Sequence, residues 1–517
     1  MKFNFKRAIA NVLISSVAFT TACGTVPEEG VPVLKNFRNT DSAAVVSMID
    51  AISEATFETE ADIESAFAAY YALEGDSRAQ VTNYEKLVAL REGIADLYED
   101  KTRQGKRVDR SKILIGTYCV NYWDEAHVKD VADCGIDFIA AAGYSREFMD
   151  NLAKYGVGAF VSCGNFGYPM WKGGDRPYGT TVSGPSFTVE DFAAAGNVTD
   201  HEAIWGIELV DEPHSDDMYF HGALSEKLLE KHPEYQVYNN LFPNYANETQ
   251  LGTLTYEEHV QDYVENFDLD YISYDHYPYD DTPGFELWIE NLRIVADAGR
   301  ANNKDYWVVV QANNQRENVF TSIEQLRMQV NTSLAFGYTV INWACWNPGW
   351  FYNNICDASG NKTEQYAKVQ QVNAEINQLS PVFMKYKNLD ANIIGYENRE
   401  LGDFYKKDDN VIDQDIFTDI QTADKTESAV LCGYFEKRIG EGNAMMFVNI
   451  TDFACAKNPQ TWVKFKVADS DVIVTEHTTA GSSVLQPDSD GYYKVVVENA
   501  EYSFVTVEKA PVAVEVE

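Results

Sequence analysis

Two carboxylates and a proline follow a short apolar run in WGIELVDEPH, residues 205–214. Asp211 and Glu212 therefore stand where a buried strand would end and a helix would begin. Acidic side chains at such a point can cap the helix, because its N-terminal dipole favours negative charge. They can also do acid–base chemistry, in which a carboxylic acid with a raised pKa delivers a proton to a leaving group.

Polar and aromatic residues follow the other apolar runs in the same way. Asp275, His276 and Tyr277 end one run, and Gln311 ends another. Turn chemistry explains some of the Asn and Asp residues, but it does not explain tryptophans and a His-Tyr-Pro run at the same position. The other residues of this kind are Asn121, Tyr122, Trp123, Asn165, Asn239, Asn240, Asn313, Trp343 and Trp346.

Residues 111–385 supply the elements that must position these groups. Strand-like apolar runs alternate there with helical patterns, and eight such pairs in about 270 residues are typical of a (β/α)8 barrel. A doubly wound open sheet is the alternative, but no Gly-rich phosphate loop follows the first strand. In a barrel the carboxyl ends of the strands form one face, so we expect the polar residues to meet there.

The flanking segments have different patterns. Residues 40–110 repeat apolar positions at helical spacing, and the run AYYALEGDSRAQVTNYEKL (69–87) resembles the small three-helix modules of Gram-positive surface proteins, which implies a spacer. Residues 386–517 read as short strands with turn signals. The predicted fold class is therefore α/β, a (β/α)8 TIM barrel with an N-terminal helical module and a C-terminal β-sandwich. Such a sandwich can bind carbohydrate, but more often it only packs against the barrel.

The N-terminus reads as an export signal, residues 1–22. Positive residues precede a moderately apolar stretch, 8–22, that is too short to span a bilayer. The following TTACG resembles a bacterial lipobox, which implies lipidation of Cys23 and a tether over residues 23–39. Ordinary cleavage beside an incidental cysteine is the alternative. We expect an exported protein on the bacterial cell surface, anchored to the membrane as a lipoprotein.

Charge and cysteine usage exclude several classes of function. With 41 basic and 80 acidic residues the formal net charge is −39, which argues against nucleic acid as a partner. Seven cysteines remain after Cys23, and an odd number does not suggest a full disulfide framework. Cys119, Cys163 and Cys345 lie in apolar runs as small buried hydrophobes. No Cys/His cluster has metal-ligand spacing, so we expect no metal and no cofactor.

The order and spacing of the strand ends resemble clan A glycoside hydrolases, particularly the family 42-type group with a (β/α)8 catalytic domain. In that clan the acid/base glutamate ends the fourth strand, usually within Asn-Glu-Pro. Here Asp211 replaces the asparagine before Glu212 and Pro213. The resemblance, over roughly residues 111–380, implies a carbohydrate substrate and Glu212 as the general acid.

The carboxylate that would act together with Glu212 is not found at the position where the clan has it. The clan's nucleophile is a glutamate at the end of strand seven, where this chain has Gln311, an amide that cannot attack an anomeric carbon. Glu317 follows, but beyond the expected position. Asp275 is the best remaining carboxylate, and as a base on water it would make an inverting or otherwise atypical hydrolase. Equally, Asp275 could bind a substrate hydroxyl or orient His276.

The remaining strand-end residues are expected to bind sugar, since aromatic faces stack on its C–H face and amides or carboxylates bind its hydroxyls. At most one of two tryptophans that end the eighth strand would face the mouth. The long loop at 164–186 could add Trp171 or Tyr178. Two other functions stay open, a catalytically inactive glycan-binding lipoprotein and a purely structural one. The expected sugar contacts are Asp211, His276, Tyr277, Gln311, Asn165, Asn240, Trp343 and Trp346.

Overall fold

The computed structural model describes residues 41–509 with gaps, of which the longest are 94–104, 167–197 (except 171–172) and 396–415. The chain divides into two compact units, the first represented by residues 41–93 and the second by 105–509. Cys23, the expected signal and the tether lie outside the described residues, as do Tyr178 and Glu317.

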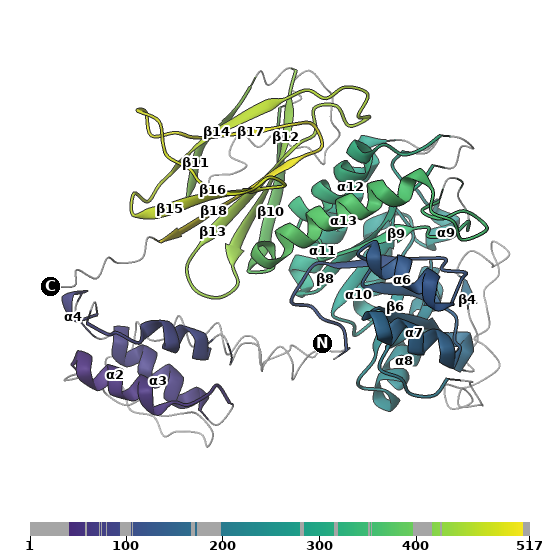
Figure 1. Ribbon diagram of the computed structural model, residues 1–517, viewed down its shortest axis with the longest axis horizontal. Helices are drawn as coiled ribbons and strands as arrows, with labels where there is room; N and C mark the ends of the chain where they lie inside the picture. Colours follow the sequence, from purple (N-terminus) through teal and green to yellow (C-terminus); the bar gives the residue numbers. More distant parts are fainter. Residues whose placement is uncertain are drawn as a thin grey trace. The chain divides into compact units, whose positions relative to one another are not determined.

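The second unit contains a closed barrel of eight parallel strands, surrounded by helices (Figure 1). The ring closes because β9 returns to pair with β1, and because Leu241 after β6 bridges to Tyr274 of β7. The predicted (β/α)8 barrel is therefore confirmed, and the open-sheet alternative is wrong. The strands are β1 (Leu114–Thr117), β2 (Phe138–Ala142), β3 (Gly158–Ser162), β5 (Ile204–Asp211), β6 (Gln236–Asn240), β7 (Tyr271–Asp275), β8 (Asp305–Gln311) and β9 (Val340–Ala344). The short strand β4 (Trp171–Lys172) pairs with the end of β5.

Local sequence sets the ends of the helices. Ser145 accepts the N–H of Phe148 at the start of α7, and Gly156 ends that helix in the left-handed conformation. Thr255 and Glu258 form a capping box on α10. The helical pattern TVEDFAAAGN, residues 188–197, lies outside the described residues. The helices are α6 (Glu125–Asp133), α7 (Arg146–Tyr155), α8 (Ser215–Lys231), α9 (Glu248–Leu251), α10 (Tyr256–Asn266), α11 (Phe285–Asn302), α12 (Ile323–Ala335) and α13 (Glu364–Phe383).

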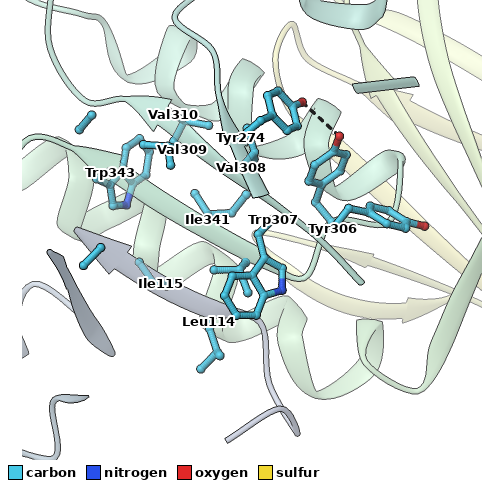
Figure 2. Packing of buried hydrophobic residues seen from close by; sticks show 14 of the residues in the cluster. Leu114, Ile115, Tyr274, Tyr306, Trp307, Val308, Val309, Val310, Ile341 and Trp343 are labelled. Carbon is cyan, nitrogen blue, oxygen red and sulfur yellow. Dashed lines mark hydrogen bonds between the residues drawn. The ribbon is translucent and has the colours of Figure 1, made fainter. Parts of the chain in front are cut away.

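Several strands carry an aromatic residue among their first three positions, and these aromatic side chains pack on one another. Trp307 stacks on Tyr271 with ring centroids 3.8 Å apart, and Phe160 stacks on Tyr238 at 5.2 Å. Figure 2 shows further buried side chains of β1, β8 and β9 around Trp307. Burying one such side chain stabilises the fold by roughly 1.5–3 kcal/mol. This packed base holds the opposite, carboxyl ends of the strands in fixed positions.

A β-sandwich follows the barrel. A six-stranded antiparallel sheet in the order β10-β12-β13-β18-β15-β16 faces a three-stranded sheet in the order β11-β14-β17. Buried side chains of both sheets meet between them, as Phe447 of β13 does with Phe465 of β14. The strands are β10 (Tyr386–Gly395), β11 (Phe417–Thr422), β12 (Ala429–Lys437), β13 (Asn443–Asn449), β14 (Thr461–Val467), β15 (Val472–Thr478), β16 (Gly481–Val484), β17 (Tyr493–Val497) and β18 (Tyr502–Lys509).

The outer face of the larger sheet packs on α12 and α13 (Figure 1). Phe383 of α13 contacts Phe435 and Phe504 of the sheet. At Gly433 the backbone of β12 passes so close to α12 that a Cβ atom would lie 2.0 Å from the carbonyl oxygen of Ala335. The barrel and the sandwich therefore share one core.

The first unit is a small helical module. It contains α2 (Ser42–Ala51), α3 (Glu60–Tyr71), the short α4 (Gly75–Arg78) and helical residues 84–91. Ile49, Ile63 and Leu87 are buried at its centre. In the described part of the chain, we find no helix with the length and hydropathy that a bilayer crossing requires.

Candidate active site

The ends of β5, β6 and β7 bring the predicted polar residues to one level on the carboxyl face of the barrel. Asp211 pairs in register with Asn240, and the bridge between Leu241 and Tyr274 places the end of β6 beside β7. β7 ends one residue later, at Asp275. Two carboxyl groups and one carboxamide, from three neighbouring strands, therefore converge.

Asp275 is buried, and its protonation is perturbed. The Nδ2 of Asn240 donates to its Oδ1 at 2.9 Å. The Oγ of Ser273 donates to the Oδ1 of Asn240 at 3.0 Å, which fixes the orientation of that amide. Burial, and next the charge of Asp211, raise the pKa of Asp275 to about 8, although the bond from Asn240 opposes them. Near neutral pH the proton therefore stays on Asp275.

Tyrosine hydroxyl groups lie around Asp275 and Asp211. Two of these tyrosines, Tyr118 and Tyr238, were not singled out from the sequence. The hydroxyl of Tyr118 donates to that of Tyr238 at 3.0 Å. Burial, followed by the charge of Asp275, raises the pKa of Tyr277 well above its usual value. The charge of Asp211 also acts on Tyr118, Tyr238 and Tyr277, so it lies among neutral hydroxyl groups. Tyr118 and Tyr238 read as core residues in sequence, because tyrosine is common in buried strands.

Glu208 is a further carboxylate in this region, and it was not singled out from the sequence. Its side chain is buried on β5, and its charge contributes to the raised pKa values of Tyr118 and Cys163. A charged residue inside the apolar run WGIELV was the available signal, since a buried charge is costly unless it is used or compensated. The mouth of the barrel therefore carries several acidic groups in close succession.

Glu212 does not cap the following helix. α8 has His214 as its N-cap, and the ring of His214 accepts the N–H of Asp216. The N–H of Glu212 donates to the carbonyl of Asn240 at 2.7 Å, and the residue has φ of 50°, a left-handed conformation that is uncommon outside glycine. The surrounding strands hold Glu212 in this conformation, and such strain concentrates at functional sites. Its side chain is half-buried.

Gln311 holds the loop after β7. Its Oε1 accepts the N–H of Tyr279 at 3.0 Å. Its own backbone is fixed by Gln329, which accepts the N–H of Gln311 at 2.9 Å and donates to its carbonyl at 3.1 Å. Tyr279 in turn stacks on Phe453 of the sandwich with centroids 5.3 Å apart. The amide at the end of β8 is thus part of a structural network that reaches the second domain.

Three of the predicted sugar contacts lie between the barrel and its helices. His276 is fully buried, its Nδ1 bonds the Oδ1 of Asn291 on α11 at 3.0 Å, and burial lowers its pKa to about 4. The Nε1 of Trp343 donates to Asn373 of α13 at 2.8 Å. Trp346 meets Tyr366 of the same helix edge to face. Both tryptophans therefore contact α13.

Asn165 lies in a single 3₁₀ turn after β3 (Cys163–Phe166). Its Nδ2 donates to the carbonyl of Ser162 at 3.2 Å, and the side chain is half-buried. This bond is local turn chemistry, so it fixes the chain at the start of the loop after β3.

Exposed apolar side chains mark the same face of the barrel. Apart from Leu254, which lies between α9 and α10, every exposed large apolar side chain described in the barrel lies between the end of a strand and the first turns of the next helix. Trp123 also stacks on Phe148, with centroids 4.9 Å apart. Such rings offer flat surfaces to a ligand. The residues are Trp123, Tyr219, Leu254, Val319, Phe320 and Tyr352. Across the described residues, no cluster of three His, Cys, Asp or Glu side chains could hold a metal ion.

Comparisons with known proteins find distant likenesses among solved structures. No family model and no curated protein matches the chain. A GH42 beta-galactosidase from G. stearothermophilus is 8% identical and has a TM-score of 0.48, covering 79% of this chain and 100% of that one. A noncanonic maltogenic alpha-amylase from Thermotoga neapolitana is 10% identical, with 77% and 99% covered and a TM-score of 0.39. A glucosidase from Croceicoccus marinus is 8% identical, with 78% and 97% covered and a TM-score of 0.36. These neighbours are glycoside hydrolases, but at this distance no residue role is transferred from them.

Proposed function

We propose that this protein is an exported, lipid-anchored glycoside hydrolase that cleaves O-glycosidic bonds of oligo- or polysaccharides. Glu212 is the general acid and Asp275 is the partner carboxylate. One observation carries the proposal: at the carboxyl face of a closed barrel, the buried Asp275 interacts electrostatically with Asp211, directly before Glu212. Perturbed carboxyl groups in this position are typical of catalytic sites.

The reaction needs two proton transfers. Glu212 gives its proton to the glycosidic oxygen while the bond from that oxygen to the anomeric carbon breaks. Water bonds to the anomeric carbon from the opposite face, and Asp275 takes the proton that the water loses. This reaction inverts the anomeric configuration and needs carboxyl groups about 6.5–9.5 Å apart. No cofactor takes part.

The environment of Asp275 limits the pH at which it can act as base. With a pKa of about 8, only a minority of Asp275 is ionised at pH 7. Ionising it there costs about 1.4 kcal/mol, a factor of ten. The ionised form is a stronger base than an exposed carboxylate, which favours proton transfer. The share of the enzyme with an ionised Asp275 is therefore expected to rise with pH towards 8, and hydrolysis rises with it for as long as Glu212 keeps its proton.

Sugar recognition is assigned to the mouth and its rim. Asp211, Asn240 and Tyr277 supply acceptors and donors for hydroxyl groups. The exposed rings of Trp123 and Tyr352 supply stacking surfaces beside them. A neutral polyhydroxylated ligand also suits a chain with a net charge of −39, which would repel anionic ligands.

A glycan-binding protein without hydrolase activity is the second candidate. Gln311 favours it, because this amide ends β8 and is engaged with the N–H of Tyr279. The proton that Asp275 retains at neutral pH also favours it, because a protonated acid is no base. The two candidates share the binding surface and differ only in turnover.

Glycan panels with matched variants distinguish the two candidates. The wild type should release reducing ends from at least one neutral glycan. Glu212→Gln and Asp275→Asn should each reduce kcat by roughly 10²–10⁴-fold, the usual share of one acid–base group, while glycan affinity persists. Asp133→Asn, on the exposed surface of α6, serves as the control. Binding without cleavage of any glycan would establish the second candidate instead.

A further inference from the structure

Two cysteines converge beside the candidate active site. Cys119 follows β1 and Cys345 follows β9, and these strands pair with each other. A Cβ atom on Gly349 would lie 2.7 Å from the Sγ of Cys119 and 3.2 Å from the Sγ of Cys345. Both sulfur atoms therefore border the space that Gly349 leaves by having no side chain. Both residues are in the thiol form.

The backbone holds the two cysteines at a spacing that suits a disulfide. Past the strand ends, the N–H of Trp346 donates to the carbonyl of Tyr118 at 2.8 Å, and the N–H of Asn347 donates to that of Cys119 at 3.1 Å. Paired strands run roughly 4.8 Å apart, and disulfides join Cα atoms about 4.4–6.8 Å apart. These backbone bonds and the shared space at Gly349 hold the two sulfur atoms close to each other.

We propose that Cys119 and Cys345 form a redox-active pair, a modification site at which a small-molecule disulfide converts the two thiols into an intramolecular disulfide. Cys119 is half-buried and Cys345 is fully buried, which assigns their order of reaction. The thiolate of Cys119 attacks one sulfur of the reagent, and the first reagent thiol leaves. The thiolate of Cys345 then attacks the Cys119 sulfur, and the second thiol leaves. Two protein thiols are oxidised, and one reagent disulfide is reduced to two thiols.

The new bond would reach the polar mouth of the barrel. The charge of Cys345 contributes to the raised pKa of Tyr277, whose hydrogen bond acts on Asp275. Oxidation removes the ionisable thiol beside Tyr277 and ties the segment after β1, which carries Trp123, to the segment after β9. The pair stands on its own geometry, and it remains whether or not the barrel hydrolyses glycans.

Peptide mapping after oxidation tests the pair. The folded full-length protein is incubated with oxidised glutathione, its remaining thiols are alkylated, and it is digested without reduction. The expected product is a linked peptide pair containing Cys119 and Cys345, lighter than the two peptides by two hydrogen atoms. Cys345→Ser should instead keep glutathione on Cys119, and Cys119→Ser should yield neither adduct nor link at Cys345.

Cys455→Ser is the matched control, because Cys455 is the other half-buried thiol that the structure describes. This variant should give the same linked peptides as the wild type. A stable glutathione adduct on Cys119 in the wild type, a link through a different cysteine, or two unmodified thiols would each overturn the proposal. Far-UV circular dichroism of the serine variants verifies that they are folded when treated.

Discussion

At the scale of residues, burial and the charge of Asp211 raise the pKa values of the groups at the mouth of the barrel. This charge acts on Asp275 and on three tyrosines, and together with burial it keeps a proton on Asp275 near neutral pH. The chain of bonds from Ser273 through Asn240 opposes this effect, because Asn240 stabilises the ionised carboxylate. The pKa of Asp275 therefore depends on the side-chain amide of Asn240, whose orientation Ser273 fixes.

Asn240→Ala should raise the pKa of Asp275 further. The bond from Asn240 lowers this pKa, so its loss favours the protonated acid and reduces the ionised fraction at any given pH. The acidic limb of kcat/KM should then move to higher pH. Ser273→Ala removes the bond that orients the amide and leaves the amide itself in place, so it should move the limb less. If the acidic limb of kcat/KM lies at the wild-type pH in both variants, Asn240 does not influence the titration of Asp275.

At the scale of elements, alternating hydrophobic patterns predicted the barrel because its strands are apolar and most of its helices begin at a capping side chain. The sequence also placed Asp211 and Asp275 correctly at strand ends, with Glu212 directly after the first of them. It could not predict which acid of the Asp-Glu pair interacts with Asp275. That depends on a register shift between Glu208 and Val210 and on the left-handed φ of Glu212. Neither follows from residue spacing.

Two further features concern how the elements pack: the tryptophans that end the eighth strand, and the strands of the sandwich. The eighth strand ends with two tryptophans, of which at most one was expected to face the mouth, and both contact α13. In the sandwich, β10 and β12 were not singled out from sequence. β10 carries polar residues at many positions, because part of it is only half-buried. A strand with this composition has the same pattern as a loop.

Gly433→Ala tests the close contact between β12 and α12. The added methyl group would lie 2.0 Å from the carbonyl oxygen of Ala335, so the sheet must move away from the helix. We expect the free energy of unfolding to fall by about 1–3 kcal/mol, as for other overpacked cores. Urea denaturation followed by tryptophan fluorescence measures it. Ser483→Ala, at an exposed site on β16, is the control and should change it by less than about 0.5 kcal/mol. Equal stability of both variants would contradict this packing.

At the scale of the whole molecule, the barrel and the sandwich form one unit, whereas the helical module is separate. Tyr279 and Phe453 link the loop after β7 to the sandwich, and the hydroxyl of Tyr279 donates to the carbonyl of Phe453 at 2.9 Å. The sandwich thus supports the wall of the candidate site.

Lipid anchoring is tested in the intact cell. We expect the wild type to incorporate radiolabelled palmitate and to sediment with membranes, because Cys23 would carry the acyl chains. Cys23→Ala should lose the label and should no longer sediment. Label retained by Cys23→Ala, or a wild type that takes up no label, would contradict the proposed anchor.

The pH dependence of kcat/KM in the wild type and in Asp211→Asn tests the central claim most directly. If Asp275 is the base, kcat/KM rises with the ionised fraction of Asp275 up to about pH 8 for as long as Glu212 keeps its proton, because the folded-state pKa of Asp275 is raised to that value. Asp211→Asn removes one of the charges that raise this pKa, so the rise should occur at lower pH. The same pH profile in both proteins, or a rise at higher pH in Asp211→Asn than in the wild type, would contradict the assignment.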